Sequence, residues 1–171
     1  MSADVPSRSV VVGVTPGQPD SVVEQAAIFA SHFNAELVCA YADTGSYTVE
    51  EGPDGTVRSM PVDPDLPSPS ESGFPAELES RLSAVLGARG AAWSTRALAG
   101  DPASALGHLA ETLDAIMIVV GTRRASMRGT MQEFFTGSVA VHLAHRQHRP
   151  VVVIPLTPVS PEDSLPWEPA R

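Results

Sequence analysis

Short apolar runs alternate along this chain with longer stretches in which hydrophobic positions recur at helical spacing. β-Branched residues dominate a first run over residues 9–15, and comparable runs cover 36–42, 93–98, 115–120 and Val151–Ile154. Runs of this length that end at glycine, proline or a charged residue are typical of strands buried on both faces of a sheet. The pattern therefore predicts five strands.

Between these strands the apolar residues return every three or four positions, which is typical of helices packed on a sheet. The spacing predicts helices at about 21–33, 75–87, 102–113 and 138–149. Asp20 and Asp101 stand where they can cap the first and third helices, and Asn34 suits the end of the first. Alternating strands and helices predict an α/β fold, a three-layer Rossmann-like sandwich whose five-stranded parallel sheet carries helices on both faces.

Residues 43–74 break this alternation, because proline, glycine, serine and acidic residues replace the periodic apolar positions. We expect a long, variable acidic excursion there, mobile in part. The predicted organisation is a disordered N-terminus over 1–8, one α/β domain over 9–156 and a Pro-rich tail over 157–171. A chain of 171 residues, 43% of them hydrophobic, can bury one core, whereas two domains would be cramped.

Composition excludes several classes of protein. The net charge of −9 argues against a nucleic-acid partner, and no apolar run approaches the roughly 20 residues that span a membrane. Residues 1–9 lack the basic and apolar regions of a signal peptide, so we expect a cytoplasmic protein. The single cysteine, Cys39, lies in an apolar run and is interpreted as a small buried hydrophobe.

The positive charge gathers in one part of the sequence. All 11 basic residues are arginine, so the lysine of a Walker phosphate loop is missing. Five arginines and three histidines lie between Arg123 and Arg149, where Glu133 is the one acid. In an acidic protein this distribution indicates an anionic ligand, although for Arg146 and Arg149 charges matched to a helix end are the simpler interpretation.

The same region contains a loop suited to phosphate. Gly121 ends one predicted strand, and Gly137 with Ser138 opens the next helix. In a parallel sheet such a loop lies at the carboxyl edge and presents backbone N–H groups and a helix N-terminus to an anion. If the chain starts in the middle of the sheet, this loop and residues 14–17 meet at one crevice.

These residues resemble the universal stress protein family over about 9–156. The similarity is carried by Val-Val-Gly-Val at 11–14, Ala-Gly-Asp-Pro-Ala at 99–103, Val-Val-Gly-Thr-Arg at 119–123, Gly-Ser-Val-Ala at 137–140 and Arg-Pro-Val-Val-Val-Ile at 149–154. The resemblance implies a homodimer that forms through the last strand, Val151, Val152, Val153 and Ile154. Such pairing would also protect an apolar edge strand from aggregation.

One branch of this family binds ATP through a glycine motif, in which two residues separate the first two glycines and nine more precede a final Gly-Ser or Gly-Thr. Here Gly121 matches the first position, and Gly137 with Ser138 matches the last pair. Arg124 replaces the second glycine, and 12 residues instead of nine follow it. Thr15 stands where ATP-binding members usually have an aspartate near the adenosine. An arginine at a position that needs glycine strains the loop or changes its path. Arg123 and Arg124 can, however, bind phosphate through two parallel hydrogen bonds each.

The resemblance implies a regulatory module without catalytic activity, which binds ATP or another adenine nucleotide, with or without Mg²⁺. The adenine would lie by Ala42 and Val14, and the phosphates would run from Gly121 towards Ser138. The residues expected at the ligand are Val14, Thr15, Pro16, Ala42, Val120, Gly121, Thr122, Arg123, Arg124, Gly137, Ser138 and Val139.

Three alternatives remain open. The chain would be a dimeric interaction protein without a nucleotide if Arg124 or a phenylalanine of the pair Phe134 and Phe135 fills the crevice. A slow ATPase would need a positioned base and a divalent ion, and the sequence offers neither. A metal site at the evenly spaced histidines 142, 145 and 148 competes with the commoner role of cations near a helix end.

Overall fold

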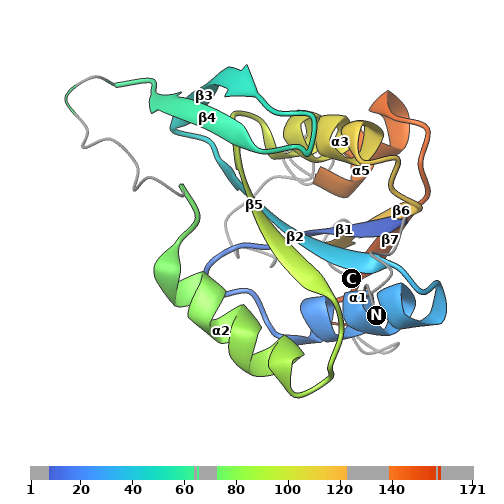
Figure 1. The fold of residues 1–171 in the computed structure, drawn as a ribbon. Coiled ribbons are helices and arrows are strands. Elements are labelled where there is room, and N and C mark those ends of the chain that lie inside the picture. The colour runs from blue at the N-terminus through green and yellow to red at the C-terminus, as the bar shows by residue number, and fades with distance from the viewer. Residues whose placement is uncertain (1–7, 64, 66–72, 123–138, 157, 159–171) are drawn as a thin grey trace, which may run out of the picture.

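The computed structural model describes residues 8–63, 65, 73–122, 139–156 and 158. Its centre is a five-stranded parallel sheet with the strand order β5-β2-β1-β6-β7 (Figure 1). These strands are β1 (Ser9–Gly13), β2 (Glu36–Asp43), β5 (Trp93–Ala99), β6 (Met117–Gly121) and β7 (Val151–Ile154). The predicted fold class is confirmed, and the chain does begin in the middle of the sheet.

Helices cover both faces of the sheet. The helices α1 (Ser21–His32) and α2 (Ala76–Gly87) pack on one face, and α3 (Pro102–Thr112) and α5 (Val139–Arg146) pack on the other (Figure 1). In the described part of the chain, no helix combines the length and apolar character that a membrane crossing requires.

Each inner strand supplies side chains to two separate hydrophobic clusters. In β1, Val10 and Val12 pack towards α1 and α2, whereas Val11 packs towards α3. All three are fully buried, and β2 and β6 divide their residues in the same way. Because side chains alternate along a strand and both faces are covered, every position must be apolar, which explains the continuous runs in the sequence.

A two-stranded antiparallel hairpin lies within the predicted excursion over 43–74. It consists of β3 (Ser46–Glu51) and β4 (Val57–Pro61), two strands that the five predicted from the sequence do not include. The turn is closed by Thr56, whose N–H and hydroxyl both donate to the carboxylate of Asp54. Gly55, which lies between these two residues, has a φ of 73°. The sequence Pro53-Asp54-Gly55 is a recognised turn signal that the periodicity analysis passed over.

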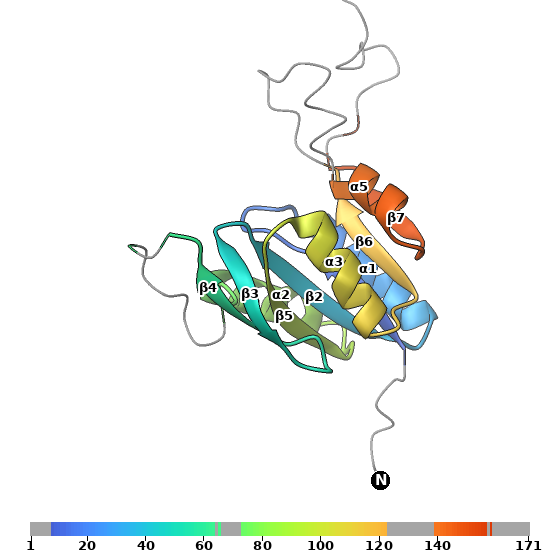
Figure 2. The same ribbon diagram turned by 90° about the horizontal axis from the view of Figure 1, so that it is seen from above.

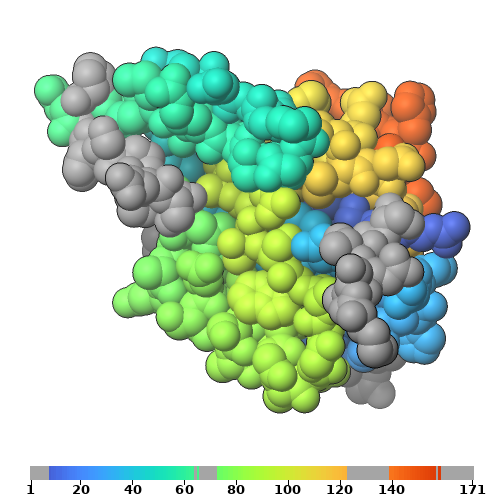
Figure 3. Space-filling view, in the orientation of Figure 1, coloured from blue at the N-terminus to red at the C-terminus, as the bar shows by residue number. Residues whose placement is uncertain are grey.

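The hairpin lies against α3, beside the edge strand β5 (Figures 2 and 3). The Glu51 carboxylate lies 2.8 Å from Nε2 of His108 and accepts a hydrogen bond of 3.3 Å from the Thr112 hydroxyl. A Cβ added at Gly55 would overlap Cδ1 of the buried Leu109. The turn is therefore seated on the helix surface rather than projecting freely.

The predicted helix caps have mixed outcomes. Asp101 caps α3, because its carboxylate accepts hydrogen bonds from the Ser104 N–H at 2.9 Å and the Ser104 hydroxyl at 2.8 Å. Asn34 adopts the expected left-handed conformation after α1, with a φ of 49°. Asp20 precedes α1 but makes no side-chain capping bond, and its carboxylate pairs with Arg81 at 2.6 Å. Asp20 has helical dihedral angles (φ −63°, ψ −22°), whereas Asp101 has the extended backbone of a capping residue, and this difference explains why the predicted side-chain cap is absent.

Candidate functional site

A cavity of about 740 Å³ opens where β1, β2 and β6 end, on the face covered by α3 and α5. The strand order reverses at this point, because β1 pairs with β2 on one side and with β6 on the other. Parallel α/β sheets bind ligands in the crevice at such a reversal. The expected meeting of the segments after the first and fourth predicted strands is thus found.

Small residues on the sheet create the space. Gly13, Ala40 and Ala42 line the cavity on the same face on which Val11 and Val38 fill the core further down the strands. A Cβ added at Gly13 would lie 3.0 Å from Cδ1 of Leu106, tighter than an ordinary contact. The floor of the cavity is therefore apolar, and the small size of these residues determines how much space lies above it.

The segment after β1 forms one wall and is held to the sheet by hydrogen bonds. The Val14 N–H donates to the Ala40 carbonyl at 2.9 Å, and Gly17 turns the chain with a φ of 73°. The Gln18 side-chain amide reaches back to the Gly13 carbonyl at 3.4 Å. Thr15 and Pro16 are exposed at the rim.

The end of β6 forms the opposite wall. The Thr122 N–H donates to the Ile154 carbonyl at 2.8 Å, and the Thr122 hydroxyl accepts from the Leu156 N–H at 2.9 Å. A Cβ added at Gly121 would lie 3.0 Å from Val22 and 3.2 Å from the Gln18 amide nitrogen. Glycine at 121 therefore allows the two walls to approach closely.

Two ionisable side chains lie among the described residues that line this cavity, Asp101 at the start of α3 and His142 on α5. The bonds from the Ser104 backbone and hydroxyl, followed by the charges of His142 and Arg146, lower the pKa of the Asp101 carboxyl below its usual range. Asp101 therefore carries its negative charge at all physiological pH values.

The residues expected at the ligand are only partly within the described chain. Lining the cavity are Val14, Thr15, Pro16, Ala42, Val120, Gly121, Thr122 and Val139. Outside the described residues lie Arg123, Arg124, Gly137 and Ser138, together with Phe134 and Phe135. Val14 contributes little side-chain surface, since it is 2% exposed and packs in the cluster next to α1.

Several lining residues escaped the sequence analysis. They are Gly13, Gln18, Pro19, Ala40, Asp101, Pro102, Leu106, His142 and Leu156. Asp101 and Pro102 were interpreted only as a helix start, although a helix that follows a parallel strand begins at the carboxyl edge where ligands bind. Ala40 carried no signal of its own, because a small residue in a buried strand is ordinary.

The three evenly spaced histidines do not converge on one point. His142 lines the crevice, whereas His148 lines a separate groove and His145 is exposed. Across residues 8–63, 73–122 and 139–156, no group of three or more His, Cys, Asp or Glu side chains is arranged to hold a metal ion. Burial raises the pKa of the Cys39 thiol to about 12, which leaves it an inert core residue.

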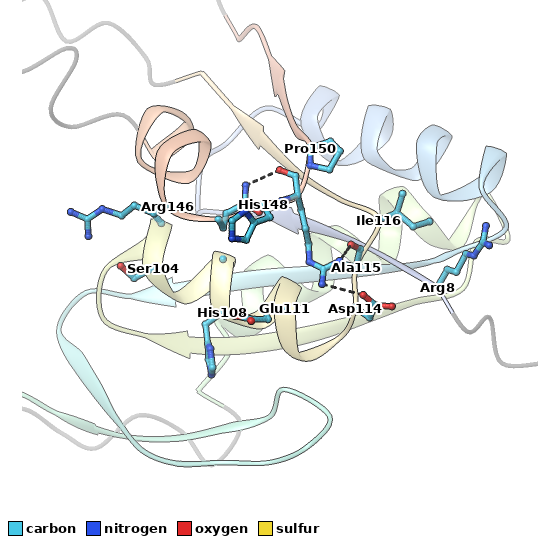
Figure 4. Close-up of a pocket in the computed structure, with 14 residues that line it drawn as sticks. Arg8, Ser104, His108, Glu111, Asp114, Ala115, Ile116, Arg146, His148 and Pro150 are labelled. Atoms are coloured by element: carbon cyan, nitrogen blue, oxygen red, sulfur yellow. Dashed lines mark hydrogen bonds and ion pairs between the residues drawn. The ribbon is translucent and has the colours of Figure 1, made fainter.

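The separate groove has a volume of about 840 Å³ and lies at the amino ends of β6 and β7, between α3 and the end of α5 (Figure 4). Arg149 lines it, donating to the Ala115 carbonyl and pairing with Asp114 at 3.1 Å. These bonds occupy the guanidinium of Arg149 with partners from the chain itself.

The chain matches the family model described as "Universal stress protein family" over residues 6–155. Among solved structures it is similar to a universal stress protein in complex with cAMP, with 26% identity and a TM-score of 0.57, over 86% of this chain and 95% of that one. No curated protein sequence matches the chain.

Two further solved structures share the fold. A universal stress protein from Archaeoglobus fulgidus in complex with dAMP is 18% identical, with a TM-score of 0.55 over 86% of this chain and 97% of that one. A member of the same family from Burkholderia pseudomallei is 21% identical, with a TM-score of 0.55 over 87% of this chain and 96% of that one.

Proposed function

The chain belongs to the universal stress protein family, and from this premise we propose that it is a regulatory module that binds an adenine nucleotide in the crevice between β1 and β6. The observation that carries the proposal is the cavity of about 740 Å³ at the carboxyl ends of these strands. Its volume lies within the range of roughly 300–1,000 Å³ that is typical of small-ligand sites.

The chemistry of the walls supports a nucleoside. Ala40, Ala42 and Leu106 offer an apolar surface for a purine ring, and Gln18 and Thr122 add polar groups to the lining. Similar proteins have been crystallised with cAMP and dAMP, and the first of these is 26% identical to this chain. ATP, AMP and cyclic AMP share the adenosine that such a surface would recognise.

In this proposal the adenine lies by Ala42 and the phosphates lie near Gly121 and the start of α5. Arg123 and Arg124, which follow Thr122 in the sequence, would hold the phosphates bidentately in place of a missing glycine contact. Mg²⁺ would accompany ATP but is not required for AMP. Ligand binding, not catalysis, is the proposed activity.

The proposal includes a homodimer that forms through β7. This strand lies at the end of the sheet, and within the described chain no other strand pairs with its outer edge. Val153 exposes 43% of its surface there. A second copy pairing along Val151–Ile154 would complete the backbone hydrogen bonds and cover this apolar side chain.

Isothermal titration with ATP, AMP and cAMP, with and without Mg²⁺, tests nucleotide binding. We expect saturable binding to the unmodified chain and at least a tenfold loss of affinity in Ala42→Leu, because the larger side chain fills the apolar floor. Ala84→Leu is the matched control, since Ala84 is exposed on α2 and does not line the cavity. Its affinity should equal that of the unmodified chain.

The Arg124→Gly variant separates the competing functions. Absence of binding in the unmodified chain with recovery in Arg124→Gly would mean that Arg124 closes the site, and absence in both would favour a dimeric interaction protein without a nucleotide. Steady release of phosphate from ATP would instead favour a slow ATPase. A malachite-green measurement on the same samples distinguishes that outcome from simple binding.

A further inference from the structure

We propose that His142 is a phosphate-contacting residue whose protonation makes nucleotide binding tighten as the pH falls through the neutral range. This inference rests on the proposed function, since it assigns a role at the same site. It names the residue that would couple ligand occupancy to pH.

The argument begins with the charges that line the crevice. Among the described lining residues, His142 is the one side chain that can become cationic, and Asp101 is the one that is anionic. An imidazolium donates charged hydrogen bonds to phosphate, whereas the neutral ring offers a single uncharged donor. The charge state of His142 therefore determines how well this wall of the cavity accepts an anion.

The position of His142 fits a phosphate. It lies one turn along α5 from Val139, and residues three apart share a helix face. Val139 and His142 both line the cavity, next to the end of β6. The side chain is half-buried, so that a ligand could reach it while part of the surrounding water is excluded. Phosphates are expected at this end of the crevice because Gly121 and the start of α5 meet there.

The charged groups that face His142 come from two described elements. From α3 the neighbouring charge is Asp101, whose pKa is lowered by the Ser104 bonds and which stays ionised. On α5 itself they are Arg146, which remains cationic, and the exposed His145, whose contribution the control His145→Gln measures. Neither β7 nor the segment 13–19 contributes an ionisable residue.

A purely structural role for His142 makes a different prediction. If the residue only pairs with Asp101 or fills space between α3 and α5, its replacement would change the stability of the fold without creating or removing a pH dependence of binding. The pH profile of the affinity is therefore the decisive measurement. The second test is whether a permanently charged side chain at position 142 gives the tighter affinity at every pH.

The experiment is isothermal titration of the full chain with cAMP and with adenosine, at about pH 5.5 and about pH 8, on either side of the usual histidine pKa of about 6.5. cAMP is the chosen probe because its phosphodiester remains a monoanion across this range. Adenosine lacks the phosphate and reports the rest of the site. The variants are His142→Gln, His142→Arg and the control His145→Gln, which changes an exposed histidine on the same helix.

For the unmodified chain and His145→Gln, we expect cAMP to bind about tenfold more tightly at the lower pH, in line with a charged hydrogen bond. His142→Gln should bind with the weaker affinity at both pH values, and His142→Arg with the tighter affinity at both. Adenosine should show no such difference. Thermal melting at both pH values identifies any variant that fails to fold.

Two results would overturn the inference while leaving nucleotide binding intact. One is cAMP affinity that does not change with pH in the unmodified chain. The other is a pH dependence that persists in His142→Gln. Absence of binding by both cAMP and adenosine at both pH values would instead remove the proposed function itself, and the role of His142 with it.

Discussion

Asp101 shows how much a single residue contributes to the local structure next to the crevice. Its carboxylate satisfies the Ser104 N–H, which would otherwise lack a partner in the first turn of α3. We expect Asp101→Ala to lower the free energy of unfolding by about 1 kcal/mol, as measured by urea denaturation at neutral pH. Asp20→Ala is the control, because Asp20 precedes α1 without a capping bond, and its exposed ion pair with Arg81 should contribute only a few tenths of a kcal/mol. Equal losses in the two variants would contradict this assignment.

The same carboxylate predicts a pH dependence of stability. Its pKa is lowered in the folded protein, so its contribution is fully present above the pKa of the unfolded chain. The contribution disappears as the pH falls through the lower, folded value. The stability difference between the unmodified chain and Asp101→Ala should therefore persist from about pH 8 to about pH 5 and shrink below about pH 4. Urea denaturation at a series of pH values measures it, and a difference that grows below about pH 4 would show that the sign is wrong.

For single residues, the sequence predicts those roles that depend only on neighbours along the chain. Asp101 before Pro102 and Asn34 after α1 need only local geometry, and both behave as expected. Asp20 does not, since its backbone is itself helical and its carboxylate pairs with Arg81 from a distant helix. His142 gave no sign that it lines the crevice, because that depends on how α5 packs against α3.

Among the elements, the hairpin depends most on one contact. Gly55 combines a φ of 73° with a position at which a Cβ would overlap Leu109, which is 1% exposed. Gly55→Ala should therefore cost about 2–3 kcal/mol, from left-handed strain together with displacement of a core side chain. Gly90→Ala isolates the strain, because Gly90 has a φ of 64° with no atom within 4 Å of the added Cβ, and should cost about 1 kcal/mol. Thermal or urea unfolding compares them, and equal costs would mean that the turn is not seated on α3.

The contrast between the main sheet and the hairpin shows which elements a sequence can predict. Strands of the parallel sheet are buried on both faces, so their continuous apolar runs stand out. The hairpin touches α3 through Glu51 and Gly55, most of β3 is exposed, and Tyr47, Met60 and the neighbouring Val62 are about half exposed or more. The polar content of β3 and β4 hides the pattern, and only the turn at Pro53-Asp54-Gly55 indicated them.

For the whole molecule, topology could be predicted further than the site. Strand–helix alternation and the right-handed crossover rule lead to one parallel sheet, and a start in its middle brings the ends of β1 and β6 together. The volume of the crevice could not be predicted in this way. The volume depends on Gly13, Ala40 and Ala42 lying side by side on one face of the sheet. Their alignment follows from the register between β1 and β2, which the sequence does not reveal.

The quaternary arrangement is the last prediction at this scale. If two copies pair along β7, Val153→Lys should place a charge in the interface and convert the dimer to a monomer, since lysine on an edge strand opposes pairing. Val62→Lys is the matched control, because Val62 is 66% exposed, compared with 43% for Val153, but lies after β4 on the hairpin. Light scattering after size exclusion should give a dimer for the unmodified chain and Val62→Lys, and a monomer for Val153→Lys with an unchanged circular dichroism spectrum. A monomer from Val62→Lys alone would move the interface to the hairpin, where Tyr47 and Met60 form the exposed apolar surface. A monomeric unmodified chain would exclude pairing through either surface, and any regulation by nucleotide would then act within one protomer.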